Sequence, residues 1–171
     1  TPLPTGHARI SEFIRVAEEM GAYVAVAHPK AAHLSWQFEA DAQVDPASRT
    51  HGYEVWTGPW QPDDEASLVA WDSMLTRGLR IFANGGSDLH GVVNTGGGAV
   101  GKPTKVVYAN RLAKPDIVAA LKGGHSFITR SPEGVEIYLT ATRPGQATYT
   151  GGTVWGAVGD LVTVTARVRR G

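Results

Sequence analysis

The feature that most constrains the fold is an alternation of helix-like and strand-like segments along most of the chain. Apolar residues recur at helical spacing in three segments: 10–20, 64–77 and 115–121. Short, largely β-favouring apolar runs occur in five: 23–27, 52–56, 79–83, 104–108 and 126–129. Because this alternation is typical of parallel strands with helices packed outside, we expect an α/β fold, either an open sheet or a (β/α) barrel.

The pattern changes after Pro132. Residues 135–142 and 161–168 alternate apolar and polar side chains, which is typical of half-exposed antiparallel strands. We therefore expect two units. Residues 1–132 form the α/β part, and residues 133–171 form the start of a small antiparallel β appendage.

Composition excludes several classes of function. The 16 Lys and Arg balance the 16 Asp and Glu, so no net charge attracts nucleic acid. The absence of cysteine excludes disulfides and thiolate-bound zinc, so any metal ion must be held by His and carboxylate side chains. Since no apolar run approaches the roughly 20 residues that span a bilayer, we expect no membrane partner and a soluble chain, cytoplasmic rather than secreted.

Three metal-ligating side chains follow two of the predicted strands. His28 comes directly after the run 23–27, and Asp88 and His90 follow the run 79–83. The carboxyl ends of parallel strands meet at one rim, where α/β proteins place their sites. Imidazole and carboxylate ligands suit zinc, manganese or iron, so we predict a divalent metal site at this rim. The alternatives are a hydrogen-bonded core histidine at position 28 and an Asx-turn with an incidental histidine at 88–90.

Three further residues are candidates for the surroundings of this site. Glu54 lies inside the run 52–56 and either points inward to support the metal ligands or is a surface charge. Trp56 either walls a pocket or packs between loop and sheet. His33 lies five residues after His28 in the same rim loop, where a solvated histidine is the usual case.

The order of these motifs resembles the PHP (polymerase and histidinol phosphatase) superfamily. The segments that carry the resemblance are Val24–Pro29 (VAVAHP), Tyr53–Trp56 (YEVW), Gly86–His90 (GSDLH) and Lys114–Thr129. It covers roughly residues 21–139 and is greatest to the branch that includes carbaryl-hydrolase-like proteins.

The resemblance implies that the chain is the C-terminal half of a metal-dependent hydrolase. The fold would then be part of a distorted (β/α)7 barrel followed by the small β appendage, with zinc, manganese or iron ions at the strand ends. His28, Asp88 and His90 match the family's metal ligands, and Glu54 matches a supporting position. The implied substrate is a small-molecule phosphoester, with an ester or carbamate as the alternative.

The chain also departs from the family. The opening His-x-His motif and the bridging glutamate of the first half have no counterpart here, so we expect the isolated chain to be inactive. The unpaired strand edge of a half barrel would favour pairing with another copy of the chain. Two rivals remain: a non-catalytic binding or scaffold module with vestigial metal residues, and an unrelated small α/β protein in which His28, Asp88 and His90 lie apart.

Overall fold

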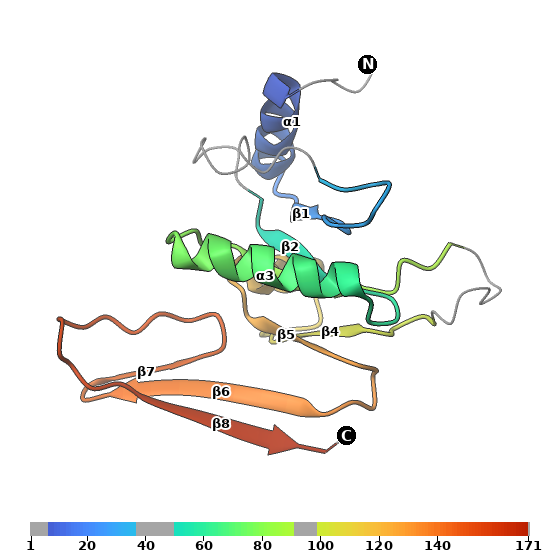
Figure 1. Cartoon of the computed structure of the whole chain (residues 1–171). Helices are drawn as coiled ribbons and strands as arrows, with labels where there is room; N and C mark the ends of the chain where they lie inside the picture. Colours follow the sequence, from blue (N-terminus) through green and yellow to red (C-terminus); the bar gives the residue numbers. More distant parts are fainter. Residues whose placement is uncertain (1–6, 37–49, 91–98, 171) are drawn as a thin grey trace.

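The computed structural model describes residues 7–36, 50–90 and 99–170, which form a mixed α/β structure (Figure 1). Its helices are α1 (His7–Glu19), α3 (Pro62–Thr76) and α4 (Lys114–Lys122). Its strands are β1 (Ala25–Val26), β2 (Gly52–Thr57), β3 (Phe82–Gly86), β4 (Thr104–Val107), β5 (Ser126–Thr129), β6 (Glu136–Arg143), β7 (Gln146–Tyr149) and β8 (Thr163–Arg169). None of the helices in these ranges has the length and apolar character needed to cross a membrane.

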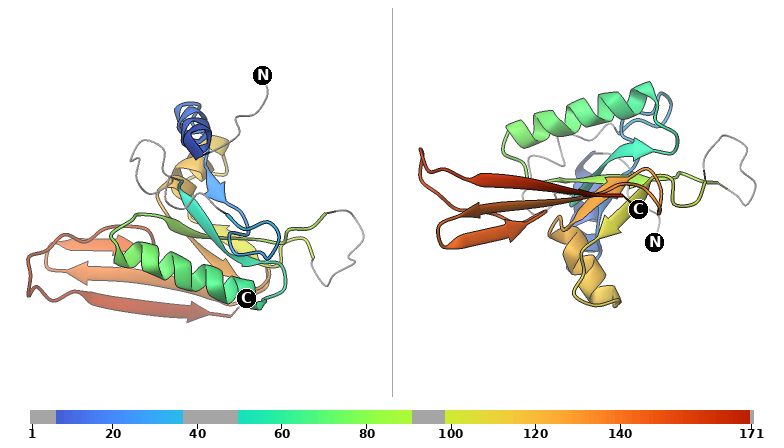
Figure 2. Two further views of the ribbon diagram at one scale, coloured as in Figure 1. Left: turned by 45° about the horizontal axis from the view of Figure 1, so that its top comes forward. Right: turned by 90° about the horizontal axis from the view of Figure 1, so that it is seen from below.

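The first sheet is parallel and has the order β1-β2-β3. α3 lies across it, and Figure 2 shows α4 on the opposite side of the strands. The core beneath α3 consists of Val26, Tyr53, Val55, Met74 and Ile81, and Tyr53 is only 1% exposed. Of these, Tyr53 and Val55 are two residues apart in β2, so the side chain of Glu54 between them belongs to the other face of the sheet.

Asp64 fixes the turn from β2 into α3. Its carboxylate accepts hydrogen bonds from the backbone N–H of Thr57 at 2.8 Å and from that of Gln61 at 2.7 Å. Gln61 is the N-cap residue, and Pro62 occupies the first turn, where a missing N–H costs nothing. The buried carboxylate therefore ties the carboxyl end of β2 to the start of the helix.

The second sheet shows that the expectation of a (β/α)7 barrel was wrong. β4 and β5 form a separate two-stranded sheet and pair antiparallel, from Thr104 opposite Thr129 to Val107 opposite Ser126. The described residues contain sheets of two or three strands and no closed barrel. Apolar runs such as 104–108 and 126–129 identify buried strands but do not encode strand direction, which is why the pattern misled.

The third sheet is antiparallel, with the order β7-β6-β8, as the alternating pattern after residue 132 predicts. It lies at the bottom of Figure 1. An aromatic cluster of Tyr108, Phe127 and Tyr138 joins it to β4 and β5, with ring centroids 5.8 to 6.3 Å apart. β8 is an edge strand whose residues are all exposed.

Candidate metal site at the carboxyl edge of the parallel sheet

The candidate site lies where the parallel strands end. β1 ends at Val26, two residues before His28, and β3 ends at Gly86, two residues before Asp88. β2 passes between them and carries Glu54. Three ligand-type residues therefore lie in or directly after three adjacent strands, toward one edge of the sheet.

A hydrogen bond connects the first two of these residues. The backbone N–H of His28 donates to Glu54 Oε2 at 2.6 Å. Glu54 is buried, with 7% of its surface exposed. Burial raises the pKa of the Glu54 carboxyl and the negative charge of Asp88 adds to this, while hydrogen bonds from His28 and Thr57 and the electrostatic attraction of His28 oppose it. Glu54, His28 and Asp88 are thus close enough to interact electrostatically.

The backbone is strained at both rim residues. His28 has φ of 29° and Asp88 has φ of 47°, in the left-handed region that side chains other than glycine rarely adopt. Such a conformation costs roughly 1–2 kcal/mol per residue. Strained residues cluster at functional sites, where the strain holds side chains in a fixed orientation. The strain therefore favours a functional reading of this edge over a purely structural one.

His28 fits a metal ligand in one specific respect. Its Nδ1 atom is buried and has no hydrogen-bond partner in the described part of the chain. A buried imidazole nitrogen normally has a hydrogen-bond partner, and an unpartnered one is able to bind a metal ion instead. Within residues 7–36, 50–90 and 99–170, however, no three His, Asp or Glu side chains are grouped closely enough to hold a metal ion. The ligand set is thus of the right type but incomplete.

The other predicted site residues lie further out. The His90 side chain is 83% exposed, and its Nδ1 lies 2.8 Å from the carbonyl oxygen of Asp88 and 3.7 Å from Asp88 Oδ1. His33 is exposed in the loop after β1. Trp56 packs edge-on against Trp60, with ring centroids 5.4 Å apart, and donates its indole N–H to the carbonyl of Gly58. The structure therefore links Glu54 with His28 and Asp88, pairs His90 with Asp88, and leaves His33 exposed.

The sequence reasoning missed a polar cluster behind this edge. Lys105 Nζ donates to the Tyr23 hydroxyl at 3.2 Å, to the carbonyl of Ala83 at 3.0 Å and to Asn84 Oδ1 at 2.9 Å. Asn84 is opposite Glu54 in the register of β2 and β3, so the cluster lies on the Glu54 face of the sheet. The sequence feature that could have predicted this cluster is Lys105, a charged residue next to two valines in β4.

Comparison with models of protein families, with curated proteins and with solved structures finds no match for this chain.

Proposed function

We propose that this chain contributes part of the catalytic centre of a metal-dependent hydrolase that acts on phosphoesters. The observation that carries the proposal is the buried, unpartnered Nδ1 of His28, a residue whose backbone N–H donates to the buried carboxylate of Glu54. The resemblance of the segments Val24–Pro29 and Gly86–His90 to the PHP superfamily supports the same assignment.

His28 and Asp88 would hold a divalent ion, with Glu54 next to them. When bound, such an ion lowers the pKa of a coordinated water and stabilises charge on the ester oxygens. Glu54 orients the His28 backbone through its 2.6 Å hydrogen bond. The raised pKa of the Glu54 carboxyl also lies closer to neutral pH, where a carboxyl group can both accept and release a proton during catalysis.

The described residues supply fewer ligands than a hydrolase of this type requires. Structural metal sites close with about four ligands, and catalytic sites keep three protein ligands plus water. We therefore expect metal binding without turnover in the isolated chain. Another chain or segment that adds His or carboxylate ligands at this edge would be needed for hydrolysis.

The test is zinc and manganese binding by the purified chain, measured by elemental analysis and by calorimetric titration. Asparagine is the substitution of choice at positions 28 and 88 because it tolerates positive φ, so a His28→Asn, Asp88→Asn double variant retains the backbone. We expect it to lose most of the metal affinity, because it removes the imidazole and a carboxylate from the proposed ligand set. His33→Asn, in the same loop, is the matched control and should bind as the unmodified chain does.

Two results would refute the proposal. One is the absence of metal binding by the unmodified chain, which would leave a binding or scaffold module as the better description. The other is metal binding that the double variant retains in full, which would place the ion elsewhere in the molecule.

A further inference from the structure

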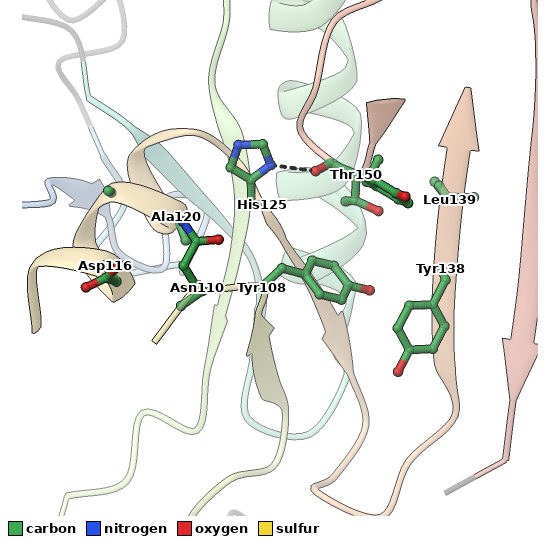
Figure 3. Close-up of a pocket in the computed structure, with 11 residues that line it drawn as sticks. Tyr108, Asn110, Asp116, Ala120, His125, Tyr138, Leu139 and Thr150 are labelled. Atoms are coloured by element: carbon green, nitrogen blue, oxygen red, sulfur yellow. Dashed lines mark hydrogen bonds between the residues drawn. The ribbon is translucent and has the colours of Figure 1, made fainter. Parts of the chain in front are cut away.

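A second candidate site lies in a cleft between α4 and the antiparallel β sheet (Figure 3). The cleft has a volume of about 630 Å³, within the range of small-molecule sites. Its walls include Tyr108, Asn110, Asp116, His125, Tyr138 and Tyr149. None of His28, Glu54 or Asp88 lines it, so it is distinct from the proposed metal site.

The aromatic walls present ring surfaces rather than hydroxyl groups. The rings of Tyr108 and Tyr138 lie 5.8 Å apart at an angle of 46°. The Tyr108 hydroxyl donates to the carbonyl of Ile137 at 3.4 Å, and the Tyr138 hydroxyl donates to Glu136 Oε2 at 2.5 Å. Both hydroxyls thus have partners and the two rings contact each other, so what they offer a ligand is the part of each ring that lines the cleft. Tyr149, 74% exposed, adds a third ring at the mouth.

The polar groups of the cleft are oriented, and they offer both donors and acceptors. His125 Nδ1 lies 2.9 Å from the carbonyl oxygen of Thr150, as drawn in Figure 3. Since a carbonyl only accepts, Nδ1 carries the proton and Nε2 is an acceptor when the ring is neutral. The Asn110 side-chain amide supplies two donors and one acceptor.

The cleft has no unbalanced ionic group among its lining residues. Arg111 donates two hydrogen bonds to the Asp116 carboxylate, from Nε to Oδ1 at 3.3 Å and from Nη2 to Oδ2 at 3.0 Å. This pair fixes the carboxylate oxygens and offsets their charge. A cationic ligand would therefore have to compete with Arg111 for the Asp116 carboxylate. A purely apolar ligand would desolvate the polar groups without replacing their hydrogen bonds to water.

We propose that the cleft binds a neutral sugar ring. The apolar C–H face of a pyranose can stack on a tyrosine ring while its hydroxyl groups, each a donor and an acceptor, pair with Asn110, Asp116 and His125. A sugar is the ligand class that combines an apolar face with uncharged, bidirectional hydrogen bonding at its edge. This combination matches both kinds of wall in the cleft.

The experiment is saturation-transfer NMR on the full chain with the methyl glycosides of glucose, galactose, mannose and N-acetylglucosamine, and with p-cresol as an aromatic probe. We expect at least one glycoside to bind. Affinity should fall about tenfold in Tyr149→Ala and in Asn110→Ala, both exposed positions at which folding is unaffected. Trp155→Ala, which removes an equally exposed aromatic ring outside the cleft, is the matched control and should bind normally.

Three outcomes would overturn the proposal. The first is that no glycoside binds to the folded chain. The second is that p-cresol binds and the glycosides do not, which would make the cleft an aromatic-ligand site. The third is that Trp155→Ala loses as much affinity as Tyr149→Ala, which would place the sugar at the connection between β7 and β8.

Discussion

Lys105 makes the stability of this protein depend on pH in a direction that is unusual for a lysine. Burial lowers the pKa of its ammonium from 10.5 to about 8, although Nζ has three hydrogen-bond acceptors. Between these two values the unfolded chain binds more protons at this site than the folded chain does. Stability contributed by Lys105 therefore increases as the pH rises through that interval.

The magnitude follows from the two pKa values. If the whole pKa difference acts on stability, the free energy of unfolding increases by about 2 kcal/mol between about pH 7 and about pH 9.5. Because solvent partly reaches the side chain and screens its charge, we expect about 1 kcal/mol. The interval stops below pH 10 because burial also raises the pKa of the neighbouring Tyr23 to about 12. Above pH 10 the unfolded tyrosine ionises first, so that group lowers stability as the pH rises.

The assay is urea unfolding followed by tryptophan fluorescence at both pH values, for the unmodified chain and for Lys105→Met. Methionine keeps an unbranched side chain but does not ionise. The difference in unfolding free energy between the two pH values should be more positive in the unmodified chain by about 1 kcal/mol. Equal pH dependence in the two proteins, or a larger gain in the variant, would refute the reasoning.

Two further predictions concern local geometry and use the same unfolding assay. Asp64→Ala should destabilise the chain by about 1–2 kcal/mol, because it removes both backbone hydrogen bonds at the start of α3; an effect near zero would contradict that role. Gly124→Ala should cost about 2–4 kcal/mol, because φ is 74° and the added Cβ would overlap the Phe82 ring. Gly145→Ala has similar φ but open space, so it should cost about 1–2 kcal/mol, and equal losses at both glycines would show that the overlap is unimportant.

The sequence located most elements because helical spacing and apolar runs depend on local patterns. The predicted strand at 79–83 is displaced from the observed Phe82–Gly86, because two consecutive glycines such as Gly85 and Gly86 are typical of a turn. In the structure Gly85 pairs with Trp56, and a Cβ there would lie 3.0 Å from Ile128 and 3.2 Å from the Trp56 carbonyl. Glycine thus allows a close approach at this position, which a single sequence does not reveal.

The candidate site was predictable in part for a different reason. His28 and Asp88 follow parallel strands, and topology alone brings such positions to one edge. The closeness of Glu54 to His28 depends on side-chain direction along β2, which the sequence left open between inward and outward. The strand direction of β4 and β5 was not predictable because it depends on contacts between distant residues, and this is where the barrel expectation failed.

The position of β2 has a consequence for the order in which the molecule opens. β2 has a strand on each side and α3 across one face, whereas every residue of β8 is exposed along a sheet edge. Backbone amides in β2 can exchange with solvent deuterium only through large unfolding events, while those on the outer side of β8 exchange through local fraying. The strand that carries Glu54 is therefore expected to belong to the slowest-exchanging unit, so the candidate metal site rests on the part of the chain that opens last.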